Sequence, residues 1–526
     1  MFLLSNIFNS NYYHAYWLTI GLLSCQQGAI KEDESKARAY YLSVSGNDLD
    51  NGSKAKPWKT ISHLNDQLLK AGDSVYFEGG QIFTGGIFID SNEMGTTGKP
   101  IVVTSYGNGK AIIDGTNATA LTVNRSSFIN ILNLGFKGSG RKTGNTKDGV
   151  IINNSNNIYI DSLSVSGFQK SGLLVYASAN VEVNRVYAYD NGFAGIHIIG
   201  RNGKTDCHDI LIRNCLAENN PGDPTNLTNH SGNGILAGYC KKVTIEYCAA
   251  SNNGWDMPRT GNGPVGIWTY ESDSVVIQHC IAYRNKTSPG ASDGGGFDLD
   301  GGVTNAVIQY CLSYENQGSG FGLFQYAGAS NWYNNVIRYN ISENDGAVTT
   351  HCAGILIWNS SDVADQLKDC FIYNNTIYNS KAPAIAYATE SKNQGFRFYN
   401  NIFIGKDDIV TGKETNSIYL GNNWYSLTNG FLIDGSTSFQ NWATTYNKEK
   451  YNNQLVGMNV NPSFVNPGIA AITAPSQLNT FTNYQLPAGS LLRTQGLDVL
   501  QLFTIDNGGK TFNQSTTPSK GIGACF

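Results

Sequence analysis

Residues 274–285 read SVVIQHCIAYRN, and six further segments of the chain repeat this pattern. The other copies span residues 157–166, 180–191, 209–220, 242–253, 305–316 and 335–345. When the copies are aligned, one position in each forms a column that holds Leu163, Val186, Cys215, Cys248, Cys280, Cys311 and Asn340. The copies recur about every 30 residues, a period that is typical of a solenoid. Alternating Val, Ile and Tyr without long helical patterns predict an all-β fold, a parallel β-helix with one coil per repeat.

The composition fits such an array and argues against one class of partner. Charged residues make up 14% of the 526 residues, while Gly is abundant at 59 and Pro is rare at 13. Many glycines and few charges suit short strands joined by tight turns. The formal net charge of −4 gives no electrostatic reason to expect nucleic acid as a partner. A repeat array of this length can form a single unit, and we expect a monomer.

Two columns of the repeat are interpreted as structural. The cysteine column is expected to point inward as a stack of small apolar thiols, with a disulfide or metal role as the alternative. No paired CxxC motif supports zinc. Five places further on, an asparagine column predicts a ladder of amides at a turn, formed by Asn191, Asn220, Asn253, Asn285 and Asn316.

The first residues have the pattern of a targeting segment. Residues 15–25 form an apolar run that is too short to span a membrane, although no Lys or Arg precedes it. Leu22-Leu23-Ser24-Cys25 resembles a bacterial lipobox, which implies a signal peptide over residues 1–25 and a lipidated Cys25. Residues 26–38 are expected to be a polar tether. Its Lys31-Glu32-Asp33-Glu34 stretch either resembles the export tag of surface lipoproteins in Bacteroidetes-type bacteria or is a solvated linker.

These features predict where the protein is located. We expect export to the outer membrane or cell surface as a lipoprotein, or otherwise a periplasmic or secreted protein. Contact with a membrane is expected only through the lipid anchor.

The rest of the chain is expected to form one array with two caps. Residues 39–405 are assigned to an N-terminal cap and the β-helix, with coils from Ile101 to Gly405. Within the cap, residues 60–72 predict a short amphipathic helix that presents Ile61, Leu64 and Leu68. The period is lost at Lys406, so residues 406–526 are expected to be an irregular C-terminal cap.

Six short motifs carry a resemblance to a known superfamily. They are YLSVSGND at 41–48, KPWKTI at 56–61, AGDSVYF at 71–77, NPSFVNP at 461–467, YQLPAGS at 484–490 and GIGACF at 521–526. In these motifs the chain resembles bacterial right-handed parallel β-helix proteins of the pectin-lyase-like superfamily. The resemblance implies a right-handed parallel β-helix. It implies less about activity, because the superfamily includes polysaccharide lyases, glycoside hydrolases and epimerases.

The second strand of each coil predicts the candidate site. Alternation points Ile267, Thr269, Phe297 and Leu299 inward, so the residues between them face outward. The outward positions hold two carboxylates, Asp298 and Asp300, flanked by Trp268, Tyr270, Phe324 and Trp358. Exposed aromatic rings in a row predict a surface that binds sugar faces. The alternative is that a long loop covers these rings and makes them a satellite core.

Long polar loops enter these strands, and we expect them to bring further side chains toward Asp298. The candidates from these loops are Asp256, Arg259, Lys286, Asp293 and His351. Glu271, at the end of the strand of Trp268, is an additional acid candidate.

One run resembles a metal site. Residues 292–300, SDGGGFDLD, resemble the calcium-binding run of family-nine pectate lyases. The resemblance implies Ca²⁺ as cofactor, held by Asp293, Asp298 and Asp300. That family has a catalytic lysine on the following coil, and this chain has Gly322 at that position. A base would then have to come from Lys286, Arg259 or His351.

Three functions remain open from the sequence. The first is a polysaccharide lyase that uses Ca²⁺ and a base from a loop. The second is a glycoside hydrolase that uses Asp298 and Asp300 as paired carboxylates, since their Cα atoms are expected about 6.5–7 Å apart. The third is a non-catalytic surface protein that binds glycans. We expect a surface-tethered enzyme whose substrate is a polysaccharide.

Overall fold

The computed structural model describes residues 36–349, 352–361, 363, 365–388, 392–413, 416–506 and 521–524. Residues 37–526 form one compact unit. The predicted signal peptide, Cys25 and all but the last three residues of the tether lie outside the described residues. Within the described part of the chain, no helix is both long and apolar enough to cross a membrane.

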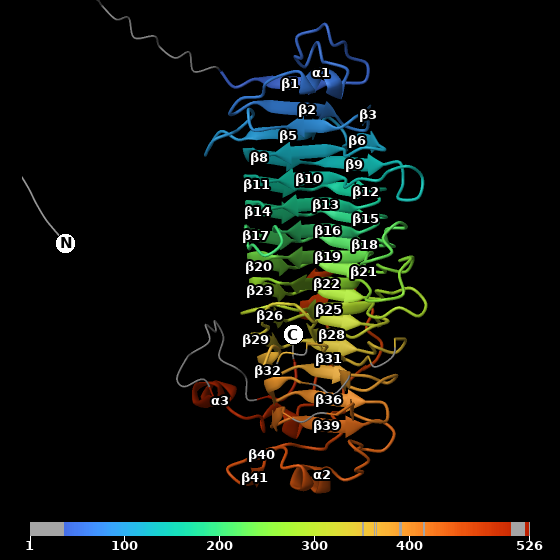
Figure 1. The fold of residues 1–526 in the computed structure, drawn as a ribbon, viewed down its shortest axis with the longest axis vertical. Helices are drawn as coiled ribbons and strands as arrows, with labels where there is room; N and C mark the ends of the chain where they lie inside the picture. The colour runs from blue at the N-terminus through green and yellow to red at the C-terminus, as the bar shows by residue number, and fades with distance from the viewer. Residues whose placement is uncertain are drawn as a thin grey trace, which may run out of the picture. The chain divides into compact units, whose positions relative to one another are not determined.

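Three long parallel sheets make a right-handed β-helix, as predicted, and its coils follow one another in chain order in Figure 1. Each full coil contributes one strand to each of the three sheets, and the chain then returns to the first sheet one coil further along.

Sheet I contains the first strand of each repeat quoted above and has 14 described strands. They are β1 (Ala39–Leu42), β2 (Ser74–Glu78), β5 (Ile101–Tyr106), β8 (Ser127–Leu132), β11 (Asn156–Asp161), β14 (Ala179–Asn184), β17 (Cys207–Arg213), β20 (Cys240–Glu246), β23 (Asp273–Gln278), β26 (Val307–Gln309), β29 (Asn335–Arg338), β32 (Lys368–Tyr373), β35 (Gln394–Tyr399) and β38 (Ile418–Leu420).

The 12 described strands of sheet II carry the glycine-led strands that include the candidate site. They are β4 (Ile87–Ile89), β7 (Leu121–Asn124), β10 (Val150–Asn153), β13 (Ser171–Tyr176), β16 (Ala194–Ile199), β19 (Asn233–Gly238), β22 (Val265–Tyr270), β25 (Gly295–Leu299), β28 (Phe321–Gln325), β31 (Ile355–Asn359), β34 (Ile385–Ala388) and β37 (Val410–Thr411).

The 13 described strands of sheet III are mostly short and lie between the other two sheets along the chain. They are β3 (Ile82–Thr84), β6 (Ala111–Thr116), β9 (Leu134–Gly138), β12 (Ser164–Ser166), β15 (Tyr187–Tyr189), β18 (Leu216–Glu218), β21 (Ala249–Ser251), β24 (Ile281–Tyr283), β27 (Leu312–Tyr314), β30 (Ile341–Glu343), β33 (Thr376–Tyr378), β36 (Ile402–Gly405) and β39 (Asn423–Ser426).

The cysteine column lies inside the β-helix, as predicted. The thiols of Cys215, Cys248, Cys280 and Cys311 are buried and unbridged. The backbone N–H of Cys215 donates to Sγ of Cys248 at 3.4 Å, and that of Cys248 donates to Sγ of Cys280 at 3.4 Å. The column therefore packs as stacked small residues along the core.

The asparagine column forms the predicted ladder. Asn220 Nδ2 donates to Asn253 Oδ1 at 2.9 Å, and the same bond joins each next pair as far as Asn316. The last rung is a carboxylate: Asn316 donates both its backbone N–H (2.9 Å) and Nδ2 (2.8 Å) to Oδ1 of Asp345. Burial raises the pKa of Asp345 to about 7. The ladder can end on an oxygen because each rung needs only an acceptor from the next coil.

A second ladder continues the cysteine column through Asn340, Asn375, Asn401 and Asn422. It also ends on a buried carboxylate, since Nδ2 of Asn422 donates to Oε1 of Glu449 at 2.8 Å. Burial raises the pKa of Glu449 to about 7.

The ends of the array differ from the prediction. Coils already begin at β1 and still pair at β39, so sheet pairing extends beyond Ile101 and Gly405 on both sides. The predicted helix over 60–72 is the shorter α1 (Ile61–Asn65), which buries Ile61 and Leu64 and leaves Leu68 56% exposed. One turn is enough to bury these two side chains, so nothing requires the helix to continue.

The C-terminal segment is irregular, as expected, but it packs along the flank of many coils. Helix α2 (Phe439–Thr445) packs Trp442 against Trp424 of the last described coil. A short antiparallel pair, β40 (Lys450–Tyr451) and β41 (Gln454–Leu455), follows it. The 3₁₀ helices η1 (Pro475–Thr480) and η2 (Leu491–Arg493) pack on sheet III, and α3 (Val499–Asp506) packs beside β32 (Figure 1).

Candidate active site

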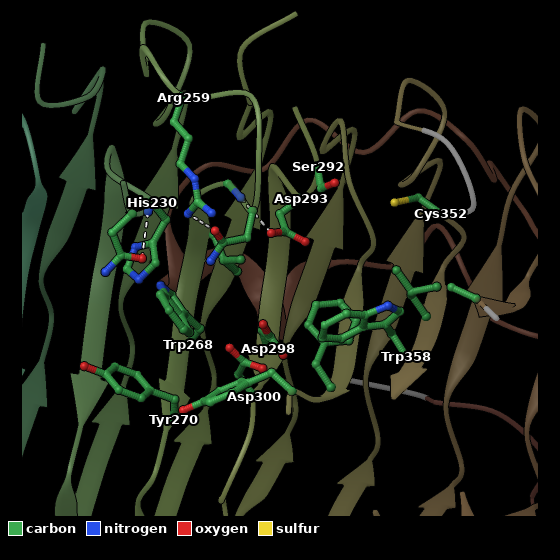
Figure 2. Close-up of a pocket in the computed structure, with 18 residues that line it drawn as sticks. His230, Arg259, Trp268, Tyr270, Ser292, Asp293, Asp298, Asp300, Cys352 and Trp358 are labelled. Atoms are coloured by element: carbon green, nitrogen blue, oxygen red, sulfur yellow. Dashed lines mark hydrogen bonds between the residues drawn. The ribbon is translucent and has the colours of Figure 1, made fainter. Parts of the chain in front are cut away.

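A cavity of about 660 Å³ lies on the outward face of sheet II. Figure 2 shows the acids Asp298 and Asp300 near its middle, with Trp268 and Tyr270 on one side and Trp358 on the other. The residues of the strands and their ends that line it are Val265, Trp268, Tyr270, Asp298, Asp300, Phe324, Tyr326, Leu356, Trp358 and Ala388. The residues of the loops that line it are Asn229, His230, Arg259, Asn262, Gly263, Ser292, Asp293 and Cys352.

Strand register places the acid pair. Asp298 on β25 lies directly between Trp268 on β22 and Gly322 on β28. Asp300 follows β25 by one residue, and its backbone N–H donates to the carbonyl of Thr269 at 2.9 Å. The backbone N–H of Gly301 donates to Oδ1 of Asp300 at 2.7 Å, which fixes the carboxyl group. Because the side-chain period of a strand is two, both acids face the same side of the sheet.

The surroundings of the acids raise their pKa values. The side chain of Asp298 is buried, and its Oδ1 has no hydrogen-bond partner among the described residues. Burial raises the pKa of Asp298 well above its usual value, and the charges of Asp300 and Asp293 raise it further. Burial raises the pKa of Asp300 to about 7, despite the hydrogen bond from Gly301. Burial also raises the pKa of Asp293 to about 6, against the N–H of Gly263 and the charge of Arg259.

Trp268 is only 4% exposed, so the predicted row of solvent-accessible rings is wrong at this position. The loop that precedes β19 folds His230 over the indole, with 4.8 Å between the ring centroids. The indole Nε1 donates to Oδ1 of Asn233 at 3.0 Å, and the ring packs against buried Leu236. Trp268 therefore lines the cavity as an almost fully covered ring.

The other side of the acid pair is apolar. Phe324, Leu356, Cys352 and Ala388 belong to one cluster, with Trp358 packed against it. Phe324 is buried, so it too departs from the predicted exposed row, whereas Trp358 and Tyr270 are half-buried. The Phe324 and Trp358 rings meet edge to face, with centroids 6.2 Å apart. Of the four predicted rings, Trp358 and Tyr270 are therefore the ones that remain partly open to the cavity.

The loops bring some predicted residues to the cavity and not others. Arg259 and Asp293 line it, and Arg259 hydrogen-bonds Asn262 at its rim. Asp256 instead forms ion pairs with Arg141 and Lys142, so its predicted approach to Asp298 is wrong. Lys286 is half-buried and does not line the cavity. His351 lies outside the described residues.

Glu271 is not among the residues that line the cavity. Its Oε1 accepts the backbone N–H of Ser330 at 2.9 Å. Its charge still helps to raise the pKa of Asp300, so it acts on the acid pair electrostatically.

Comparisons with known proteins place the chain in a family. Residues 40–351 match the family described as Pel9A-like, right handed beta helix region. The chain belongs to this family. It also matches an uncharacterized protein, YwoF, from Bacillus subtilis (strain 168), with 31% identity over 99 residues, which is 19% of this chain and 20% of that protein.

Solved structures show the same fold at low identity. A GH136 lacto-N-biosidase from Eubacterium ramulus is similar with a TM-score of 0.50 and 17% identity over 69% of this chain and 67% of that one. Pectate lyase Pel9A has a TM-score of 0.47 and 16% identity over 93% of this chain and 97% of that one.

Membership in the Pel9A-like family directs attention to Gly322, where the family resemblance placed a lysine. A Cβ at this position would lie 2.7 Å from the ring of Phe324 and 2.9 Å from Oδ1 of Asp298. The ring of Phe324 therefore occupies the space that a side chain at 322 would need.

The carboxylates suit a cation in their chemistry. A bound Ca²⁺ would give the unpartnered buried oxygen of Asp298 a contact. Its charge would also stabilise the ionised form of the acids whose pKa values are raised. No group of three His, Cys, Asp or Glu side chains is arranged to hold a metal ion in the part of the chain that the structure describes. The calcium site therefore stays a prediction.

Several lining residues were missed by the sequence analysis. His230 and Tyr326 were not assigned, because both lie beyond the ends of the strands. For Tyr326 a signal existed, since it follows Phe324 at the same period of two. The sequence offered His230 only as a weaker candidate from a long polar loop, because the path of such a loop is not encoded in a periodic pattern.

Proposed function

We propose that this protein is an enzyme that cleaves glycosidic bonds of a polysaccharide by hydrolysis, with Asp298 and Asp300 as its acids. The observation that carries the proposal is the pair itself. Two carboxyl groups face one cavity, and the pKa of Asp298 is raised well above its usual value while that of Asp300 is about 7. Two neighbouring carboxyl groups, one protonated and one ionised, can serve as proton donor and as ionised partner in one reaction.

The roles follow from the surroundings of each acid. Asp298 keeps its proton and donates it to the oxygen of the leaving sugar as the glycosidic bond breaks. Asp300, once ionised, either takes a proton from the attacking water or attacks the sugar carbon itself. In the second case water releases the sugar from Asp300, and Asp298 accepts the proton of that water. Tyr270 and Trp358 would hold the sugar rings beside the acids.

Family membership favours a second candidate, a lyase that requires calcium. Bound Ca²⁺ would neutralise the carboxylate of a uronate and make the neighbouring C–H group more acidic. Asp298 and Asp300 would supply two of the ligands, and Asp293 would have to move toward them, since no three described acids are arranged to hold an ion. Among the described lining residues Arg259 is the one Lys or Arg side chain, so it would face the uronate or the proton to be removed. Hydrolysis ranks first because Gly322 and Phe324 fill the position where the resemblance placed a lysine.

Surface tethering is part of the proposal. Lipidation of Cys25 would hold the enzyme on an exported surface near its polymer. Labelling with a palmitate analogue tests this: label on the wild-type protein that is absent from Cys25→Ala supports the anchor, and equal labelling of both contradicts it.

The activity is tested with polygalacturonate, alginate, rhamnogalacturonan and xylan. New reducing ends and the ultraviolet absorbance of unsaturated uronates are recorded together, with added Ca²⁺ and with a chelator. Reducing ends without absorbance, and without a calcium requirement, support hydrolysis. Absorbance that disappears with the chelator supports the lyase. Binding of a polymer without any product would contradict both and leave a glycan-binding protein.

A further inference from the structure

The coil on the N-terminal side of the cavity is closed to ligands. The outward residues of β19 are Leu236 and Gly238, and Leu236 is 0% exposed. The ring of Tyr270 lies over Gly238, where a Cβ would lie 2.4 Å from a ring carbon. The glycine thus lets a side chain of β22 cover the neighbouring strand.

One buried asparagine holds this wall together. Oδ1 of Asn233, the first residue of β19, accepts the indole N–H of Trp268 at 3.0 Å. Its Nδ2 donates to the carbonyl of Phe193 at 3.0 Å and lies 3.0 Å from Nδ1 of His230. Asn233 is 0% exposed, so its amide joins three elements away from water.

Stacked rings continue the wall to the preceding coil. The ring of Phe193 lies 5.6 Å from that of His230 and 5.0 Å from that of His197 on β16, centroid to centroid. These rings stand over the outward faces of β16 and β19, where a glycan that ran along the sheet would have to lie.

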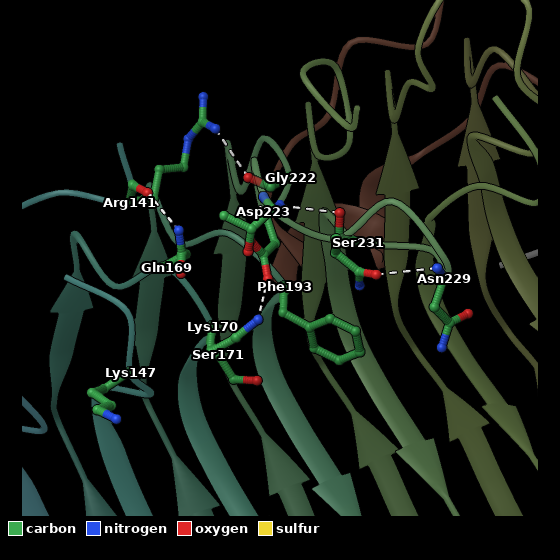
Figure 3. Close-up of polar contacts among 12 residues, drawn as sticks. Arg141, Lys147, Gln169, Lys170, Ser171, Phe193, Gly222, Asp223, Asn229 and Ser231 are labelled. Atoms are coloured by element: carbon green, nitrogen blue, oxygen red, sulfur yellow. Dashed lines mark hydrogen bonds and ion pairs between the residues drawn. The ribbon is translucent and has the colours of Figure 1, made fainter. Parts of the chain in front are cut away.

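The loop that carries His230 is anchored in the polar network of Figure 3. Asp223 is fully buried and forms an ion pair with Lys170. Its backbone N–H donates to Oγ of Ser231 at 3.0 Å, next to His230. The side chain of Arg141 donates to the carbonyl of Gly222 at 3.0 Å. Contacts from two earlier coils therefore fix the loop that closes the cavity.

The cavity extends differently on its two sides. Toward the N-terminus only β22 lies between Asp298 and the wall. Toward the C-terminus the lining continues over β28, β31 and β34 through Phe324, Trp358 and Ala388. Since coils are about 4.8 Å apart, one side has room for little more than one sugar ring and the other for a longer piece.

We propose that the cavity receives the end of a glycan chain rather than its middle, and that the enzyme releases one terminal unit in each turnover. The proposal rests on hydrolysis or elimination at Asp298. The terminal sugar lies over β22 against the wall of Phe193, His230 and Asn233, and the rest of the chain leaves across β28 to β34.

The products of the wild-type enzyme test the proposal. From whichever polymer of the panel is cleaved, a single small product is expected at the earliest times, with little fall in viscosity. A ladder of intermediate fragments with a rapid fall in viscosity would overturn the proposal while leaving glycosidic cleavage intact. No product from any polymer would contradict the proposed function instead. Binding then decides: tetrasaccharides of the panel blocked at both ends should not bind Asp298→Asn, and equal binding of blocked and free ones would overturn the proposal.

Opening the wall gives a second measurement. The double variant Phe193→Ala/His230→Ala removes the rings over β16 and β19, so fragments from the middle of the chain are expected to appear. Phe88→Ala is the matched control, because Phe88 lies on the outward face of β4 in the same sheet and is 46% exposed. An unchanged product pattern in a folded double variant would overturn the role of the wall. If the double variant does not fold, the product pattern of the wild-type enzyme still decides.

Discussion

Asp298 and Gly322 are paired across neighbouring coils, and Oδ1 of Asp298 would lie 2.9 Å from a Cβ at position 322. The carboxyl group and the ring of Phe324 together fill the place of a side chain there. The carboxyl group of Asp298 can therefore take this position because residue 322 has no side chain.

Gly322→Ala tests this fit. The methyl group is expected to push the Phe324 ring or the Asp298 carboxyl group by several tenths of an ångström and to lower kcat about tenfold or more. Steady-state kinetics and thermal melting measure the two effects. Adding Phe324→Ala should relieve the crowding and restore part of the lost stability. A fully active Gly322→Ala enzyme would show that the fit at this position is not required.

The two tryptophans of the cavity should behave differently. Trp358→Ala is expected to weaken glycan binding several-fold with little loss of stability, since a ring contact contributes about 0.5–1.5 kcal/mol. Trp268→Ala is expected to destabilise the fold by about 3–5 kcal/mol, because it removes a buried ring and the indole N–H that donates to Oδ1 of buried Asn233. Calorimetric binding and denaturant unfolding separate these effects. Equal stability losses in both variants would contradict the assignment.

The pH dependence of turnover should report Asp300. If Asp300 must be ionised and Asp298 protonated, kcat/KM is expected to rise with pH through the pKa of Asp300, about 7, and to fall where Asp298 loses its proton, at a pKa that burial raises well above its usual value. The pH profile on the cleaved polymer is the measurement. A profile that peaks near pH 4, where both carboxyl groups hold protons, would be inconsistent with these roles.

The end of the asparagine ladder predicts a pH-dependent stability. The pKa of Asp345 is about 7 when folded and lies near 4 when unfolded, so the folded state binds the proton more tightly. This contribution is fully present below about pH 4 and is lost as the pH rises through about 7. Asp345→Asn keeps the acceptor for Asn316 without the buried charge.

That variant is expected to exceed the wild-type stability by about 1–3 kcal/mol at pH 8 and to match it near pH 4. Urea unfolding at the two pH values measures the difference. Asn316→Asp, which places a carboxylate one rung earlier, is the control and should lower stability at pH 8. A difference for Asp345→Asn that is independent of pH would contradict the explanation.

Periodic features of the fold could be predicted from the sequence. Cys248 and Asn253 recur in register in neighbouring repeats, and the structure stacks both columns inside. The register of Trp268, Asp298 and Gly322 also followed from the period of two. These features are local and repeated, so each copy supports the others.

Features that depend on loops could not be predicted. Trp268 is buried because a loop carries His230 over it, and Asp256 turns away because it pairs with Arg141 and Lys142 of the distant loop between β9 and β10. Neither contact corresponds to a periodic pattern in the sequence. The raised pKa of Asp298 likewise depends on burial that the sequence does not state.

The central claim is that Asp298 performs the chemistry of this cavity, and Asp298→Asn tests it most directly. The amide has nearly the same shape but cannot donate the proton of the acid, so turnover should fall at least about a hundredfold. Calorimetric titration of the same variant with the cleaved glycan should give a Kd within a few-fold of the wild-type value. Asp298→Asn with wild-type turnover would contradict the account and place the catalytic centre elsewhere on the β-helix.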